Sequence, residues 1–254
     1  MKIKNYVIGH LSRWSLFCLL ISITFQISAQ ERKPMLLDVK NEAYVLRCFA
    51  SHNDKVKSHA VAVGDPTNIH YLFDSDNGTL LKVWKGEFVD VAPMWINRGG
   101  GFFKTSAETK DISDVPVFAM LSDKNAIWPD SATFAKSYKF KGYKVDKTGR
   151  PTFSYSVNDL KVEDKMLPTE AKDGLSRELS ITSDNEISNL YVLLAEGKDI
   201  KKSSKNTYTV AGKNYTLKLE GKAKPIIRES NGREELLLLV DGGKQANVKY
   251  TISL

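Results

Sequence analysis

Short alternations of apolar and polar residues, separated by turn residues, dominate the first half of the chain. They predict strands at Tyr44–Phe49, His59–Val63 and Ile69–Phe73. The run Asp74–Gly78 predicts a hairpin turn, because Asn-Gly accepts the positive φ values that such turns require, and Leu80–Trp84 is the expected return strand. No apolar periodicity of a substantial helix accompanies these runs. The pattern therefore indicates antiparallel β structure.

The second half repeats this style. Ser137–Val145 is a predicted strand with Gly142 as a bulge, and Thr152–Val157 is the predicted strand after the next turn. Leu236–Leu239 is apolar at every position, which is typical of a central strand covered on both faces. Two further hairpins are predicted from their turn residues: Tyr208–Val210 with Tyr215–Leu219, and Leu236–Val240 with Val248–Ile252.

Strands at this spacing predict an all-β protein, an antiparallel β-sandwich. The glycines, prolines and short irregular runs of residues 99–136 separate two hairpin-rich halves, 30–136 and 137–254. The pattern leaves two arrangements open, which are one large two-sheet sandwich in a continuous domain 30–254 and two small consecutive sandwiches.

The first 29 residues have the pattern of an export signal. Lys2, Lys4 and Arg13 form a basic region, Leu16–Phe25 is apolar, and small residues precede a cleavage site after Ala29. The apolar run is shorter than a membrane span of about 20 residues. We therefore expect an exported, periplasmic or extracellular protein without a membrane span after cleavage; retention of the signal as an anchor is the alternative.

Charge and cysteine content narrow the function classes. The whole chain has a net charge of +7, but removal of the signal leaves 34 basic and 30 acidic residues, a net charge of +4. These charges are scattered, so we expect no nucleic-acid partner. After cleavage only Cys48 remains, which excludes an intramolecular disulfide and covalent c-type haem. Its apolar surroundings indicate a small buried residue rather than a reactive thiol.

The segment 81–101 carries the densest set of groups for binding a flat polar ligand. Two tryptophans offer ring faces for a sugar or another ring, and polar side chains beside them offer hydrogen bonds. The competing interpretation is a core corner in which Trp84 is buried and Asp90 caps a turn before Pro93. The candidate ligand-binding residues are Trp84, Asp90, Trp95, Asn97 and Arg98.

Catalytic and metal motifs give no comparable signal. A G-x-S-x-G nucleophile elbow is missing from the sequence, and His59 and His70, which would face each other across a sheet, lack a third zinc ligand. Asp74 and Asp76 belong to a hairpin turn that departs from the EF-hand pattern. We expect no cofactor, no metal and no catalytic residue. A carboxylate pair drawn from distant strands is the alternative, with Glu87, Asp90, Glu163 and Asp164 as candidates.

Several segments together resemble an uncharacterised exported bacterial β domain that accompanies c-type cytochrome and membrane-bound-dehydrogenase-like modules. The resemblance spans most of residues 44–165. It is carried by His59–Gly64, Ile69–Asp74, Leu81–Asp90, Met94-Trp95 with Arg98-Gly99, Phe140–Tyr143 and Pro151–Tyr155. It implies a periplasmic setting but no function, and this chain lacks the haem motif of the multidomain proteins.

These observations lead to two hypotheses. The first is an exported, non-enzymatic binding or accessory module whose ligand is a carbohydrate or a periplasmic redox partner protein. The second is a polysaccharide-acting hydrolase that uses carboxylates near Leu81–Gly101. The sequence leaves the oligomeric state open.

Overall fold

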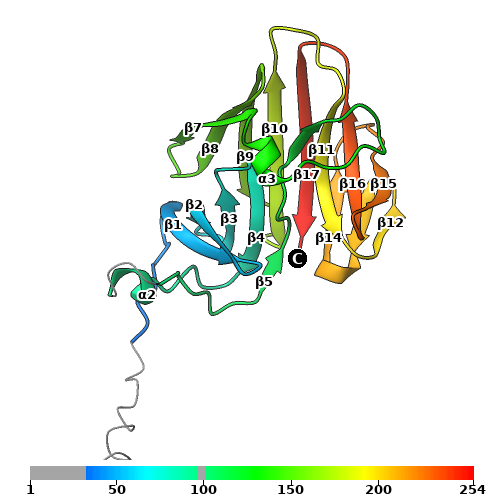
Figure 1. Cartoon of the computed structure of the whole chain (residues 1–254). Helices are drawn as coiled ribbons and strands as arrows, with labels where there is room; N and C mark the ends of the chain where they lie inside the picture. The colour runs from blue at the N-terminus through cyan, green and yellow to red at the C-terminus, as the bar shows by residue number, and fades with distance from the viewer. Residues whose placement is uncertain (1–32, 97–100) are drawn as a thin grey trace, which may run out of the picture. The chain divides into compact units, whose positions relative to one another are not determined.

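The computed structural model describes residues 33–96 and 101–254, and nearly all of its regular structure is β (Figure 1). The predicted export signal at 1–29 and the candidate residues Asn97 and Arg98 lie outside the described residues. No helix within the described ranges has the length and hydrophobicity to span a bilayer.

A five-stranded antiparallel sheet is built from consecutive strands of the first half. Its members, in spatial order, are β1 (Tyr44–His52), β2 (Lys55–Gly64), β3 (Ile69–Asp74), β4 (Thr79–Lys85) and β5 (Thr109–Asp111). The β3–β4 pair closes through the predicted turn, with Asp74 opposite Thr79. The first four strands therefore form a meander, as the alternation indicates.

The largest sheet has eight strands and takes most of the second half. In spatial order they are β12 (Ile200–Ser204), β13 (Thr207–Val210), β14 (Tyr215–Leu219), β17 (Gln245–Ser253), β10 (Gly174–Thr182), β9 (Leu160–Pro168), β8 (Pro151–Val157) and β7 (Tyr138–Val145). The predicted bulge at Gly142 is confirmed by a register shift between Phe140 and Gly142.

A four-stranded sheet completes the fold. Its order is β15 (Ile226–Ser230), β16 (Arg233–Val240), β11 (Leu190–Gly197) and β6 (Phe118–Met120). Among the described residues, short helical turns lie between strands at α2 (Ala92–Trp95), α3 (Ser131–Phe134) and η1 (Ala211–Lys213).

One of the predicted hairpins is wrong. β16 pairs with β11 and β15, whereas β17 pairs with β10 and β14, so the turn after Val240 carries the chain from one sheet to another. The central position of β16 is confirmed. Leu236 faces the main core, and Leu237 belongs to a small separate apolar cluster on the opposite face of the four-stranded sheet.

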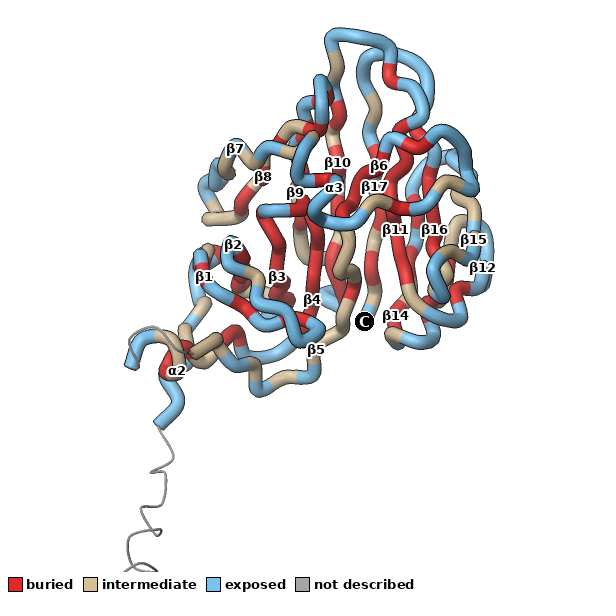
Figure 2. Tube along the Cα trace, viewed as in Figure 1, coloured by how far each residue is buried: buried red, intermediate tan, exposed pale blue. Residues whose placement is uncertain are grey.

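A single buried cluster joins side chains from all three sheets, which pack together as an all-β sandwich and confirm the predicted fold class. The eight-stranded sheet forms one layer, and the other two sheets lie against it (Figure 1). The strands of both layers are buried along most of their inner faces (Figure 2). Residues of 44–136 and of 137–254 thus share one core.

The outer face of the five-stranded sheet is covered as well. A second apolar cluster there includes Cys48, Leu72 and Trp84, and it is closed by the segment that follows β4 and by Leu37 and Val39. Because both of its faces are covered, β3 is buried at every position. This packing decides which parts of the predicted binding segment remain accessible.

His70 on β3 is held as a neutral ring, and its burial has a consequence for stability against acid. The Asp65 amide donates to its Nδ1 at 3.1 Å, and its Nε2 lies 2.8 Å from the Gly86 carbonyl, so Nδ1 is an acceptor and Nε2 the donor. Burial lowers the pKa of His70, outweighing the Gly86 and Asp65 contributions that raise it.

We expect the free energy of unfolding to fall as the pH drops below about 6.5, the ordinary pKa of an unfolded-chain histidine. The sign follows from the lowered pKa: above that pH both states are neutral, and below it the unfolded chain takes up the proton first. Urea titrations at about pH 7.5 and about pH 5.5 should show a smaller loss in His70→Gln than in wild type. An equal loss of unfolding free energy in both proteins would mean that groups other than His70 cause the acid destabilisation.

Candidate functional site

A bulge in the β1–β2 hairpin shapes the edge of the five-stranded sheet. Cys48 pairs with Ala60 and Ala50 with Lys57, so two residues of β2, Ser58 and His59, lie opposite one residue of β1, Phe49. The His59 carbonyl in this bulge accepts hydrogen bonds from the backbone and side chain of Ser75. Bulges occur often next to binding sites, where they redirect side chains.

A groove of about 650 Å³ runs beside this bulge. Its apolar wall combines side chains from three separate parts of the chain, and its polar groups come from β1, β2 and the β3–β4 turn. We call it the β1 groove. It is lined by Arg47, Cys48, Phe49, Val56, Ser58, His59, Ala60, Val61, Ser75, Met94, Trp95, Gly101, Phe102 and Phe140.

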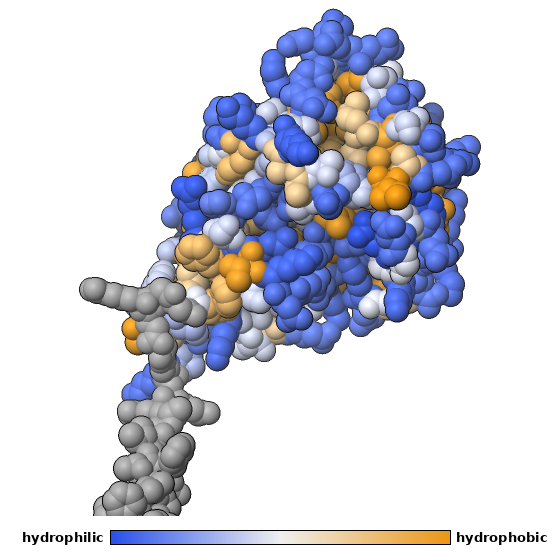
Figure 3. Space-filling view, in the orientation of Figure 1, coloured by the Kyte–Doolittle hydropathy of each residue, from blue (hydrophilic) through white to orange (hydrophobic). Residues whose placement is uncertain are grey.

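Apolar side chains with large exposed surfaces gather at the β1 groove. Phe49 is 58% exposed, Val56 63% and Trp95 50%. Apolar surface is visible on this side of the molecule, over the β1–β2 hairpin and the neighbouring segments (Figure 3). Isolated exposed apolar residues are common, but several that line one hollow are typical of a binding surface.

Trp95 is half-exposed and lies in α2, within the segment 81–101. Its backbone amide donates to the Val91 carbonyl within α2. Asp90 accepts hydrogen bonds from the amides of Met35 and Ala92, which ties the start of α2 to the chain entering the domain. Asp90 therefore holds the backbone before α2 in place, and it is not among the residues that line the groove.

Trp84 does not take part in a binding surface, which corrects its assignment as a ligand-binding residue. It is 1% exposed, its ring is stacked on Phe88 at a centroid distance of 6.1 Å, and its Nε1 donates to the carbonyls of Glu87 and Phe88. The physical reason is the second apolar cluster, which covers the outer face of β4. Of the five candidate residues, only Trp95 lies in the groove among the described ones.

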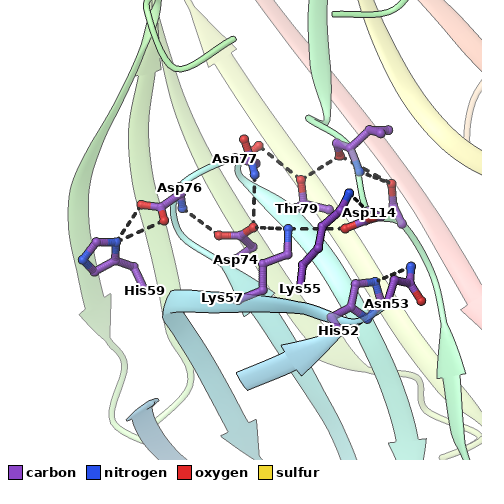
Figure 4. A network of polar contacts seen from close by, with 12 residues as sticks. His52, Asn53, Lys55, Lys57, His59, Asp74, Asp76, Asn77, Thr79 and Asp114 are labelled. Atoms are coloured by element: carbon purple, nitrogen blue, oxygen red, sulfur yellow. Dashed lines mark hydrogen bonds and ion pairs between the residues drawn. The ribbon is translucent and has the colours of Figure 1, made fainter. Parts of the chain in front are cut away.

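A charged network adjoins the β1 groove near the tip of the β1–β2 hairpin (Figure 4). Lys57 Nζ lies 3.0 Å from Asp74 and 3.3 Å from Asp114, which also lies 3.3 Å from Lys55. Burial opposes the charge of Lys57, but the two carboxylates outweigh it and raise the pKa of Lys57. The network lines a second hollow of about 700 Å³ that shares Val56, Ser75 and Phe140 with the groove.

In the hairpin turn Asp74–Gly78, both carboxylates have partners within the protein. Asp74 accepts from Asn77 at 3.1 Å, and Asp76 lies 3.0 Å from His59 Nδ1. His59 and His70 do not face each other, since His59 is exposed at the groove and His70 is buried beside Trp84. Within residues 33–96 and 101–254, no three histidine, cysteine or acidic side chains are grouped as metal ligands would be.

The carboxylates named for a hydrolase are not gathered at the groove. Asp164 is fully buried in an ion pair with Arg177, while Glu163 is on the exposed face of the same strand. Glu87 accepts a hydrogen bond from Ser106, and Asp90 accepts one from the Ala92 amide. Cys48 is a buried free cysteine, and burial raises the pKa of its thiol to about 11. A thiol with so high a pKa is a poor nucleophile near neutral pH.

Several groove residues were missed by the sequence reasoning. Phe49 offered a signal, because Leu46, Cys48 and Ala50 alternate into the core and place Phe49 in the exposed phase of β1. No local sequence signal pointed to Phe102 or Phe140, because they reach the groove through the packing of distant segments.

The chain matches neither a protein-family model nor a curated protein. Its resemblance to the exported domain thus stays a prediction.

Proposed function

We propose that this protein is a non-enzymatic binding module that works after export, and that its ligand binds in the β1 groove. The observation that carries the proposal is the gathering of exposed Phe49, Val56 and Trp95 around one hollow at an edge of the sandwich. Burying such apolar surface contributes roughly 25 cal/mol per Å², so a few side chains supply a useful part of a binding free energy.

A partner protein fits this groove better than a carbohydrate. A stacking platform for sugar rings called for two tryptophans, but Trp84 is in the core, which leaves Trp95. The groove also borders the backbone of β1, an edge strand, and edge backbone is a common element of polypeptide recognition. We therefore propose a periplasmic or extracellular protein as the partner.

The test is a selection of short peptides from a display library on the exported, purified protein, run beside a panel of cellulose and chitin oligosaccharides. We expect peptides that bind wild type and lose affinity about tenfold in Trp95→Ala, because Trp95 is an exposed aromatic anchor. The matched control is Ile127→Ala, which removes an exposed apolar side chain outside the groove.

If oligosaccharides bind in a way that depends on Trp95 and no peptide binds, the ligand of the groove is a carbohydrate and not a protein. Peptide affinities that are unchanged in Trp95→Ala, or that fall equally in Ile127→Ala, would place the site elsewhere. Binding of neither class would overturn the proposal.

A further inference from the structure

Resting on the proposed role of the β1 groove, we infer that the partner contributes an extended, acidic segment of polypeptide, which adds to the five-stranded sheet as a strand beside β1. Four observations lead to this inference: the open edge of β1, the protection of the other sheet edges, the apolar side chains on both sides of β1, and the charge of the strands that border the groove.

The edge of β1 is open. β1 pairs with β2 on one side, and among the described residues its nine residues make no other backbone–backbone hydrogen bond. Figure 1 shows no strand beyond it in the five-stranded sheet. Half of its backbone N–H and C=O groups are therefore directed away from the sheet, as a template for another strand.

The other sheet edges have the features that prevent such pairing. β5 and β6 are three residues long, and β12 carries Lys201 and Lys202. β15, the other edge of the four-stranded sheet, is five residues long and carries Arg228 and Glu229. β7 carries three lysines and the bulge at Gly142. β1 is nine residues long and has Arg47 as its single Lys, Arg, Asp or Glu. Long, apolar edge strands are those most prone to accept a partner strand.

Apolar side chains flank β1 on both faces. Met94 packs against the cluster that contains Cys48, on the outer face of the sheet, whereas Phe140 packs against the inner core. Both line the groove together with Phe49 and Trp95. An added strand directs alternate side chains to opposite faces, so the residues of either face would meet an apolar wall.

The charge of the bordering strands selects an acidic partner. β1 and β7 contain no Asp or Glu, and Arg47, Lys139, Lys141 and Lys144 are all exposed. The acids of the adjoining network are each within ion-pair distance of Lys55, Lys57 or His59. A second copy of this chain would bring two basic edges together, which disfavours self-pairing through β1.

The test uses a capped octapeptide that alternates valine and glutamate, together with a valine–lysine version and two N-methylated versions of the acidic peptide. One N-methylated version carries the methyl groups on the valines and the other on the glutamates. Alternate amides of a strand point to opposite edges. We expect the acidic peptide to bind, and one N-methylated version to lose affinity at least about tenfold while the other keeps most of it.

The valine–lysine peptide should bind more weakly than the acidic one in wild type, and Arg47→Glu should narrow or reverse that preference. Lys201→Glu, on the edge strand β12 outside the groove, is the matched control and should leave the preference unchanged. Equal binding by both N-methylated versions and the parent would refute strand addition while leaving the groove as a binding site. A preference for lysine would refute the acidic class. Failure of the octapeptides and of every library peptide would overturn the proposed function itself.

Discussion

Replacing Arg177 with methionine is expected to lower the free energy of unfolding by about 3–5 kcal/mol, because it leaves a buried carboxylate without its counter-charge. Arg177 Nε lies 3.0 Å from one oxygen of Asp164, which is fully buried, and Arg177 also donates to the Gly78 carbonyl at 2.7 Å. The pair thus joins the eight-stranded sheet to the β3–β4 turn. Tyr155 donates to the same carboxylate.

Urea denaturation followed by tryptophan fluorescence measures this loss. The control is Lys161→Met, an exposed lysine on β9 whose replacement should change stability by no more than about 0.5 kcal/mol. The double variant Asp164→Leu, Arg177→Met should be more stable than Arg177→Met alone, since no charge is left unpaired. A single variant as stable as the control would contradict the buried pair.

Trp84→Ala is expected to cost about 3–5 kcal/mol of unfolding free energy, as is usual for a large aromatic removed from a core. The variant also leaves two carbonyls, those of Glu87 and Phe88, without the indole donor. Trp95→Ala removes the same side chain from a half-exposed position and should cost less than about 1 kcal/mol.

The two tryptophan variants are therefore a matched pair, and the measurement is again the urea midpoint with an unchanged slope. Equal losses in both variants would contradict the division of the segment 81–101 into a buried part at Trp84 and an accessible part at Trp95. A large loss in Trp95→Ala alone would reverse that division.

The local pattern was sufficient for ten of the strands and for most of the predicted hairpins, whereas β5, β6, β9, β10, β11, β12 and β15 were not predicted. Asp74–Gly78 and the turn after Val210 join adjacent strands because the turn residues fix the local reversal. Asp241–Gly243 also reverses the chain, yet β16 and β17 belong to different sheets. A turn signal states where the chain bends, whereas the partner of a strand depends on packing between residues far apart in sequence.

The site was less accessible to prediction. Trp84 and Trp95 are the same residue type, and only Trp84 is buried because the apolar cluster on the outer face of β4 covers it. The alternation in β1 was sufficient to expose Phe49, but the bulge that sets Ser58 and His59 opposite it has no local sequence signal. The approach of Phe140 from β7 follows from the sandwich as a whole.

Amide hydrogen exchange in Tyr44–His52 tests strand addition at β1, because the β1 edge is both the open backbone of the sheet and one side of the proposed binding groove. The measurement compares the free protein with the protein saturated by the acidic octapeptide. We expect slower exchange at alternate residues of β1 on binding, with little change in β12, another edge strand. Unchanged exchange throughout β1 in the peptide-bound protein would contradict the addition of a partner strand at β1.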